Sequence, residues 1–279
     1  MRKMKSEEKL ENLKKMISEM GHVLIAFSGG VDSTFLLKVC VDVLGRENVI
    51  AVTASSPTYQ MDEMEEAKKI AQFFGVKHVI IHTNEMGNEK FLSNTVERCY
   101  FCKKELFSKL KEIAAEHGIK HVLDASNADD SLDYRPGMKA ARELGIKSPL
   151  LEAGITKEEI RKFSKEMGLP TATKPSQSCL ASRFPYGEKI TEEKLKMVAE
   201  AEKFLKELGF KVVRVRHHGN IARIEVDKNE MVRLMEERIR KKIYERLKEI
   251  GYTWVCLDLM GYRSGSMNEA IRGGQNEEI

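Results

Sequence analysis

The N-terminal part of the chain alternates between short apolar runs and longer amphipathic stretches. The apolar runs are rich in Val and Ile and occupy residues 22–28, 48–55, 77–83 and 120–126. Helical patterns separate them at about residues 33–44, 60–74 and 99–117. Parallel strands need long crossover connections and are covered on both faces, so this alternation predicts a doubly wound parallel α/β sheet.

A second, smaller domain follows residues 171–178, where the periodic pattern loosens into small polar residues. Just before this stretch, Thr156 and Glu159 have the spacing of a capping box, which predicts the start of a helix that closes the first domain. After it, the sequence predicts a helix at 191–208, a β-hairpin at 211–227, a charged helix at 228–249 and a strand at 252–259. We therefore expect an α/β domain over residues 1–174 and a smaller α+β domain over residues 175–279.

Composition narrows the location and the partners. The 279 residues carry a net charge of +4 without a long block of like charge, so the sequence does not favour nucleic acid as a partner. The sequence contains no run of about 18 apolar residues, so a membrane span is not expected. The charged N-terminus lacks the apolar centre of a secretory signal. We expect a cytoplasmic protein that binds a small molecule. The amphipathic pattern at 228–249 leaves a homo-oligomer open.

The first candidate site lies where "SGGVDS" ends the first apolar run, at residues 28–33. Gly29 and Gly30 allow a tight turn and a close approach of the backbone to a ligand. The amides at the following helix start point outward beside the positive end of the helix dipole, an arrangement that binds phosphate. No lysine stands where a Walker A loop needs one. The alternative is a strand–helix turn without a ligand.

This stretch resembles the pyrophosphate loop of the PP-loop ATP pyrophosphatase superfamily, whose members split ATP into AMP and pyrophosphate. The resemblance implies that Asp32 helps to hold Mg2+ and that ATP is bound by Phe27, Ser28, Gly29, Gly30, Asp32 and Ser33. Further polar residues follow the second and fourth strands, at the sheet edge where doubly wound folds bind ligands. They are Thr53 and Ser55, expected near adenine or ribose, and Asn127, Asp129, Asp130, Asp133 and Arg135.

Three of the five cysteines are candidates for sulfur or metal chemistry, because a disulfide framework is not expected in a reducing compartment. Cys99 and Cys102 share one face of a helix start, and Cys179 lies in the segment between the domains. Three cysteines can ligate three irons of a [4Fe-4S] cluster and leave the fourth iron open for sulfide. A zinc site with a histidine and a redox-active CxxC pair remain alternatives. Cys40 and Cys256 are expected to be small core residues.

Four further stretches are similar to the LarE family of ATP-dependent sulfur transferases. They lie at residues 124–150, 179–191, 213–226 and 257–270, and the similarity runs from about residue 5 to residue 271. The resemblance implies that ATP adenylates a carboxylate of pyridinium-3,5-biscarboxylic acid mononucleotide and that sulfur then gives the thiocarboxylate. This product leads to the nickel-pincer nucleotide cofactor of lactate racemase.

The resemblance also implies two possible sources of sulfur. In single-cysteine members of the family, the residue that matches Cys179 donates its own sulfur and is left as dehydroalanine. This chain adds Cys99 and Cys102, which favours the cluster-bearing members instead. There, all three cysteines are metal ligands and a cluster-bound sulfide is transferred. Sulfide or another sulfur donor is then an expected partner.

Charged residues of the second domain complete the expected site. Arg214 and Arg216 are two apart on a strand and face one side, and guanidinium pairs suit phosphate; the family resemblance assigns them to the substrate phosphate. Arg183 is a further phosphate candidate. Glu202 and Glu225 match positions of the family's site and are expected to hold Mg2+ or to accept protons, although a helical glutamate such as Glu202 is by default a surface charge.

Other functions use some of the same features. A tRNA thiolase shares the loop and a three-cysteine site, an ammonia-using ligase shares the loop alone, and a nucleotide sensor would bind ATP without catalysis. The absence of a basic run argues against the first of these. His217 and His218 flank the hairpin turn and are expected to be exposed rather than to bind a ligand.

Overall fold

The computed structural model describes residues 5–132, 135–175, 178–263 and 265–269. Asp133, one of the expected site residues, lies outside the described residues. The chain divides into two compact units. Unit 1 comprises Met1–Phe91 and Val96–Gln177, and unit 2 comprises Leu92–Thr95 and Ser178–Ile279. Unit 2 therefore takes in a four-residue segment that precedes Cys99 in the sequence.

Unit 1 is built on a parallel sheet. Its strands are β1 (Val23–Ala26), β2 (Val49–Ser55), β3 (Lys77–His82) and β4 (His121–Leu123), in the order β3-β2-β1-β4. All three pairings are parallel, and Val23 pairs with both Val49 and His121. The predicted doubly wound α/β fold is confirmed. Because successive strands leave β1 first on one side and then on the other, the topological switch point lies between β1 and β4, where such sheets bind ligands at their carboxyl ends.

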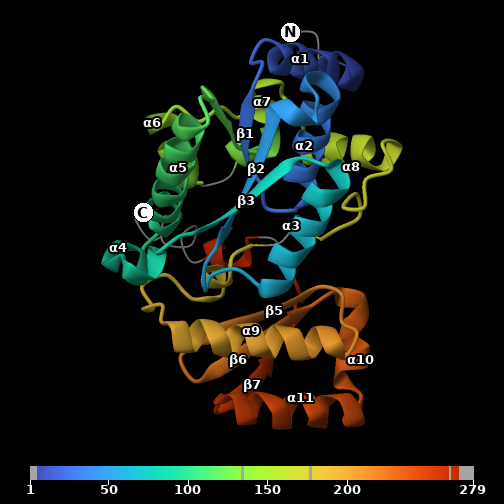
Figure 1. The fold of residues 1–279 in the computed structure, drawn as a ribbon. Helices are drawn as coiled ribbons and strands as arrows, with labels where there is room; N and C mark the ends of the chain where they lie inside the picture. The colour runs from blue at the N-terminus through green and yellow to red at the C-terminus, as the bar shows by residue number, and fades with distance from the viewer. Residues whose placement is uncertain (1–4, 133–134, 176–177, 264, 270–279) are drawn as a thin grey trace, which may run out of the picture. The chain divides into compact units, whose positions relative to one another are not determined.

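Helices cover both faces of this sheet (Figure 1). The helices of this unit are α1 (Ser6–Ser18), α2 (Val31–Leu44), α3 (Met61–Phe74), α5 (Arg98–Glu116), α6 (Gly137–Glu143), α7 (Pro149–Glu152) and α8 (Lys157–Glu166). The short α4 (Glu89–Leu92) begins in unit 1, and its last residue belongs to unit 2. Short 3-10 turns add η1 (Arg46–Asn48), η2 (Glu85–Gly87) and η3 (Ala128–Leu132).

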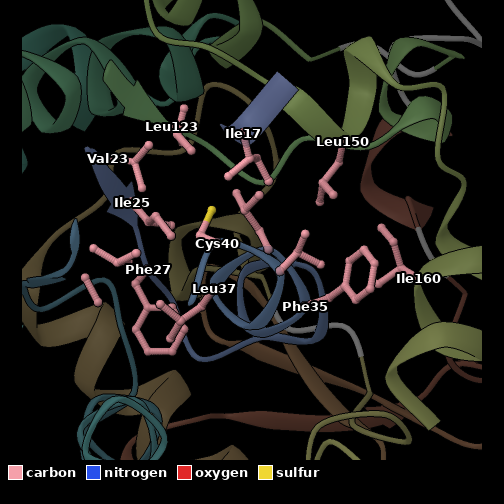
Figure 2. Close-up of a cluster of buried hydrophobic side chains, with 14 of the residues drawn as sticks. Ile17, Val23, Ile25, Phe27, Phe35, Leu37, Cys40, Leu123, Leu150 and Ile160 are labelled. Atoms are coloured by element: carbon pink, nitrogen blue, oxygen red, sulfur yellow. The ribbon is translucent and has the colours of Figure 1, made fainter. Parts of the chain in front are cut away.

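Alternate side chains of β1 serve two different cores. Val23 and Ile25 pack with α1, α2, α3 and α8, whereas Leu24 packs with α5 and α6 on the other face, as the period of two in a strand requires. Figure 2 shows the first core, with Phe35 and Leu37 of α2 and Cys40 among the buried side chains. Cys40 is fully buried, and burial raises the pKa of its thiol. Its predicted place in the core is confirmed.

The capping box at the start of α8 is also confirmed. The Thr156 hydroxyl accepts a hydrogen bond from the Glu159 backbone N–H at 3.3 Å, and the Glu159 carboxylate accepts one from the Thr156 N–H at 2.9 Å. These bonds satisfy two amides that a helix start otherwise leaves without an intrahelical acceptor. They also fix the position of Lys157, the first residue of α8.

Unit 2 contains a three-stranded sheet in the order β5-β6-β7. Strands β5 (Val213–His218) and β6 (Ile221–Val226) form the predicted hairpin, and β7 (Trp254–Leu257) pairs parallel to β6. The helices are α9 (Glu192–Glu207), α10 (Met231–Met235) and α11 (Glu237–Ile250), with 3-10 turns η4 (Leu180–Arg183), η5 (Lys228–Glu230) and η6 (Ser266–Asn268). One core joins α9, α11 and alternate residues of β5 and β6.

The prediction of one continuous helix over 228–249 is wrong. Glu236 has extended backbone angles (φ −54°, ψ 131°) and separates α10 from α11. A physical reason lies in the core: Leu234 and Ile243 are both buried in it, yet nine residues of straight helix would place them on opposite faces. The break lets both side chains reach the same core.

Two further expectations for unit 2 are wrong. Cys256 is exposed rather than in the core, because β7 is an edge strand on which Trp254 and Cys256 point outward while Val255 and Leu257 are half-buried. His217 is buried, and its Nδ1 lies 3.2 Å from the Tyr252 hydroxyl.

Among the residues that the structure describes, no helix combines the length and the apolar character that crossing a bilayer requires.

Candidate active site

The phosphate-binding candidate of unit 1 is a backbone loop between β1 and α2. The ladder between β1 and β2 continues to Phe27, whose N–H donates to the Val52 carbonyl at 2.8 Å. Gly29 then has φ +66°, and a Cβ there would lie 3.0 Å from the Ala67 Cα of α3. Both the left-handed angle and the close approach of α3 require glycine at this position. Gly30 is the N-cap residue of α2 and has no side chain to cap the helix, so the first amides of α2 are available to an anion.

Two serine hydroxyls lie on the same side of this loop. The Ser28 and Ser33 Oγ atoms are 3.1 Å apart, and the Gly30 N–H donates to the Ser28 Oγ at 3.3 Å. Ser33 also accepts from the Ser28 N–H and donates to the Gly30 carbonyl, each at 3.3 Å. These long bonds bring two hydroxyls and one amide together at the positive end of α2. Such a group of donors can exchange its internal bonds for stronger bonds to phosphate oxygens.

Asp32 lies in the first turn of α2 and forms an ion pair with Lys157 at the start of α8. Only its Oδ2 is used in this pair. The Oδ1 atom is buried and has no hydrogen-bond partner in the described part of the chain. A carboxylate oxygen of this kind is a ligand that Mg2+ prefers.

The loop after β4 brings a second carboxylate to the switch point. Asp130 is buried, accepts from the Asn127 N–H at 3.0 Å and pairs with Arg135 at 2.9 Å. Burial raises the pKa of Asp130, and the negative charge of Asp32 acts in the same direction. Asp129 accepts from the Lys157 backbone N–H at 2.8 Å. Asp129 of this loop and Asp32 of the phosphate loop are therefore linked through Lys157.

Phe27 and Thr53 take part in this region through internal contacts. The Phe27 side chain is buried in the core, so its role near a nucleotide is limited to its backbone. The Thr53 hydroxyl donates to the Phe27 carbonyl at 2.8 Å and lies 2.8 Å from the His78 Nε2. Ser55 is the half-buried last residue of β2. His78 was not predicted; burial lowers its pKa, and Lys68 adds to this shift.

Two lysines distant in sequence also reach the loop. Besides Lys157, Lys174 places its ammonium 3.0 Å from the Gly29 carbonyl oxygen. Neither lysine was identified from the sequence, because each is more than a hundred residues from the loop that it contacts. For Lys157 a signal existed, since the capping box fixes the direction in which the first residues of α8 point.

The charged residues of unit 2 form a buried cluster around Arg183. Glu202 of α9 is fully buried and accepts a two-pronged interaction from Arg183, at 2.7 Å and 3.0 Å. Glu202 also accepts from the Val215 N–H at 3.0 Å. Burial alone would raise the pKa of Glu202, but the Arg183 charge outweighs it and the pKa is lowered. The other nitrogen of the Arg183 fork donates to the Cys179 carbonyl at 3.1 Å and to the Ser178 carbonyl at 2.8 Å.

Arg183 therefore holds the loop that carries Cys179. Cys179 is half-buried and is the N-cap residue of η4. Its carbonyl also accepts from the Ser182 N–H at 3.0 Å. The structure thus brings Cys179, Arg183 and Glu202 together. From the sequence, Arg183 was a further phosphate candidate, and Glu202 was expected either to hold Mg2+ or accept protons or to be a surface charge.

Arg214 and Arg216 lie on the face of the hairpin opposite the apolar core of unit 2. Arg216 pairs with the buried Glu225 at 2.7 Å and donates to the Ser266 hydroxyl at 3.1 Å. The Arg214 guanidinium lies 5.1 Å from the centre of the Tyr262 ring. Burial lowers the pKa of Arg214, and the charges of Arg183 and Arg216 contribute. Three buried arginines face two buried glutamates in this cluster, so its excess positive charge favours an anion.

The three candidate ligand cysteines are divided between the units. Cys99 lies in the first turn of α5 in unit 1 and Cys102 at the start of its second turn, and both are half-buried. A guanidinium nitrogen of Arg98 lies 3.9 Å from the Cys99 Sγ. Cys179 belongs to unit 2. Within residues 5–132, 135–175, 178–263 and 265–269, no three His, Cys, Asp or Glu side chains form a metal-binding group.

Sequence comparison relates the chain to several known proteins. The NAD synthase family model matches residues 6–109, which include β1, the loop and α2. An uncharacterised protein of Synechocystis is 46% identical over 265 residues, or 95% of this chain and 98% of its own length. A glutamine-hydrolysing GMP synthase component of Thermoplasma volcanium is 29% identical over 192 residues, or 64% of this chain and 61% of its own length.

A characterised relative covers both units. The pyridinium-3,5-bisthiocarboxylic acid mononucleotide synthase of Lactiplantibacillus plantarum is 38% identical over 265 residues, which is 93% of each chain. This match extends from the phosphate loop through the arginine cluster and beyond the part that resembles NAD synthase. The chain therefore belongs to the LarE family, whose members are ATP-dependent sulfurtransferases built on a PP-loop domain.

Proposed function

We propose that this chain adenylates a carboxylate of pyridinium-3,5-biscarboxylic acid mononucleotide and delivers sulfur to it, giving the thiocarboxylate used in nickel-pincer cofactor synthesis. The observation that carries the proposal is the 38% identity over 93% of both chains with a synthase of the bisthiocarboxylic acid mononucleotide. The local geometry supports it, because the chain has an anion-binding backbone loop in unit 1 and a buried cationic cluster in unit 2.

The first step would take place at the phosphate loop. A carboxylate oxygen of the substrate attacks the α-phosphorus of ATP, the bond from that phosphorus to the bridging oxygen breaks, and pyrophosphate leaves. Ser28, Ser33 and the Gly30 amide would hold the departing pyrophosphate. The buried Asp32 Oδ1 and the neighbouring Asp130 fit Mg2+, which binds proteins through one or two carboxylates and shares its other ligands with phosphates.

The substrate nucleotide would be held by unit 2. Arg214 and Arg216 would bind its phosphate, since guanidinium groups match phosphate oxygens in geometry and charge. Glu225 holds Arg216 through an ion pair, and Glu202 holds Arg183. These pairs support a positioning role for both glutamates, in place of the Mg2+ binding or proton acceptance that the sequence had suggested. Ser266, which donates to Glu225 at 3.1 Å, would keep the same pair in place.

Cys99, Cys102 and Cys179 are the residues that would hold a [4Fe-4S] cluster as the source of sulfur. Three half-buried thiols are a suitable donor set, and the helix start that carries Cys99 and Cys102 favours negative charge. When bound, such a cluster supplies sulfide at its fourth iron, with free sulfide or another sulfur donor to replenish it.

Anaerobic incubation with ATP, Mg2+, sulfide and the pyridinium dicarboxylate tests the proposal. Mass spectrometry should show a mass gain of sulfur for oxygen in the substrate, together with AMP and pyrophosphate. The double variant Cys99→Ser/Cys102→Ser should lose iron, acid-labile sulfide and turnover, while the matched variant Cys256→Ser should keep all three. An active protein that holds zinc without iron, or dehydroalanine at position 179 after turnover, would reject the cluster. Salt-sensitive binding of tRNA with tRNA thiolation would reject the substrate.

We also propose that copies of this chain associate through unit 2. An apolar groove of about 500 Å³ lies between α11 and β7 and is lined by Leu234, Met235, Tyr244, Val255 and Leu257. Glu237, Arg240 and Lys241 stand at the same groove, and opposite charges of this kind can pair across a two-fold interface. Light scattering should show an oligomer that Tyr244→Glu dissociates.

The free cysteines suit a reducing compartment such as the cytoplasm.

A further inference from the structure

The Lys174 side chain contacts a backbone carbonyl of the phosphate loop rather than the groups proposed to bind phosphate. Its Nζ donates to the Gly29 carbonyl at 3.0 Å and pairs with Glu66 of α3 at 2.7 Å. The Lys174 side chain is only 11% exposed. Burying a lysine is costly unless its charge is paired, so this contact is a specific feature of the loop.

The backbone that presents Lys174 is itself held in place. The Arg161 guanidinium of α8 donates to the Ala172 and Lys174 carbonyls, both at 2.8 Å. The Lys174 N–H donates to the Thr171 carbonyl at 3.0 Å, which closes a turn. Arg161 and this turn therefore fix the point from which the Lys174 side chain reaches Gly29. All of these contacts lie within unit 1, whereas the residues proposed to bind the substrate phosphate belong to unit 2.

The contact determines the orientation of one peptide group. In a planar trans peptide, the carbonyl and the following N–H point in opposite directions. The carbonyl of Gly29 points to Lys174, so the N–H of Gly30 points away from it, toward the Ser28 hydroxyl. We propose that Lys174 is a positioning residue that locks the Gly29–Gly30 peptide in one orientation. In this orientation the Gly30 N–H points toward the Ser28 hydroxyl, on the side of the phosphate loop where phosphate would bind.

Two glycines flank this peptide, which is why a lock is needed. Glycine populates positive and negative φ about equally, so a peptide between two glycines can rotate at small cost. In the rotated state a carbonyl oxygen would face the phosphate and repel it. Lys174 stabilises the binding orientation, and its charge also polarises the peptide so that the Gly30 N–H becomes a stronger donor. The lock thus favours bound pyrophosphate and ATP over the rotated, non-binding state.

Binding of inorganic pyrophosphate with Mg2+ to the full chain, measured by calorimetry, tests the lock without the pyridinium substrate. A failure of the proposed thiolation therefore leaves this test intact. Lys174→Met should weaken pyrophosphate binding and raise the KM for ATP about 10- to 100-fold, with a smaller effect on kcat at saturating ATP. Lys174→Arg, which can still donate to the Gly29 carbonyl, should restore most of the binding. The surface variant Lys162→Met should bind pyrophosphate as the wild type does.

Two further measurements separate the lock from a general loss of structure. Glu66→Gln removes the ion pair but leaves the carbonyl contact, so it should weaken binding less than Lys174→Met. The Gly30 amide resonance should move on pyrophosphate addition in the wild type and start from a different position in Lys174→Met. If Lys174→Met does not fold, Arg161→Gln should give a weaker form of the same binding defect. Wild-type pyrophosphate affinity in Lys174→Met or in Arg161→Gln, or equal effects of Glu66→Gln and Lys174→Met, would overturn the proposal.

Discussion

The phosphate loop of unit 1 and the arginine cluster of unit 2 both suit anions, but they are built in different ways. The loop uses backbone amides, two glycines and the start of α2, and its charged partners Asp32 and Lys157 are each about one quarter exposed. The cluster is built on pairs of charged side chains, with backbone groups completing their hydrogen bonds, and its Arg183–Glu202 pair is 2% and 0% exposed. The first site depends on backbone geometry and the second on compensation of buried charge.

This difference determines how each site responds to mutation. A change of charge at the loop should alter ligand binding and leave the fold intact, because water can solvate the remaining partner. A change of charge in the cluster should alter stability, because a buried charge without a partner cannot be solvated. Substitutions that remove one charge from each site can therefore break or sharpen the comparison.

The largest expected effect is on Glu202. Glu202→Ala leaves the buried Arg183 guanidinium without its two-pronged partner, so we expect the free energy of unfolding to fall by about 3–5 kcal/mol. Denaturant unfolding of the full chain, followed by circular dichroism, measures this loss. The matched variant Glu207→Ala, on the same helix, removes a surface pair with Lys203 at 3.9 Å and should change stability by less than about 0.5 kcal/mol. Similar losses of unfolding free energy in the two variants would show that the buried Arg183–Glu202 pair contributes no more to stability than a surface pair does.

Asp32 at the loop should show the opposite behaviour. Asp32→Ala removes the carboxylate oxygen proposed for Mg2+ and the partner of Lys157, so pyrophosphate release with substrate should fall at least about 100-fold. Thermal unfolding should change little. Asp42→Ala on the same helix, which removes a surface pair with Lys38 at 2.5 Å, is the control and should keep full activity. Unchanged pyrophosphate release in Asp32→Ala would remove the loop from the reaction.

A third prediction concerns pH and the partly exposed pairs of unit 1. Glu159 accepts hydrogen bonds from Lys9 at 2.8 Å, from Ser6 at 2.8 Å and from the Thr156 N–H at 2.9 Å. Burial opposes these contacts, but together they lower the pKa of Glu159 to about 2 from its ordinary 4.5. A lowered pKa in the folded state means that the stabilisation is present above about pH 4.5 and is lost as the pH falls toward 2.

Comparison of the wild type with Glu159→Gln measures this contribution. Because the carboxylate is partly solvated, we expect the wild type to lose about 1–2 kcal/mol more than the variant between pH 5 and pH 2.5. The exposed neighbour Glu158 provides the control, and Glu158→Gln should follow the wild-type curve. Parallel curves for the wild type and Glu159→Gln would contradict the assignment of the low pKa to this site.

The two regions also differ in how much of them could be predicted from the sequence. The loop at 28–33, the four strands and the capping box at Thr156 were predicted because each depends on neighbouring residues. Lys157 and Lys174 were missed because only folding brings Lys157 to Asp32 and Lys174 to Gly29. The break at Glu236 was missed for the same reason, since it serves a core contact of Leu234 and Ile243 that the local helical pattern does not reveal.

The buried charges of unit 2 were only partly predictable. Glu202 occupies the apolar stripe of α9, seven residues after Leu195 and four after Val198, which are both buried. A glutamate at such a position signals a buried partner, but the sequence does not say that the partner is Arg183. Likewise, Arg214 and Arg216 could be placed on one face, whereas their burial depends on the segments that cover the hairpin.

The smallest expected effect compares matched helix caps in the two units. Thr156 caps α8 and Thr191 caps α9, each by accepting a backbone N–H three residues on, at 3.3 Å and 3.2 Å. Alanine at either position should cost about 1 kcal/mol of unfolding free energy. Only Thr156→Ala should also raise the KM for ATP a few-fold, because Thr156 positions Lys157 beside Asp32, whereas Thr191 starts a helix of the other unit. An equal rise in the KM for both variants would mean that helix stability in general, rather than the placement of Lys157, controls the phosphate loop.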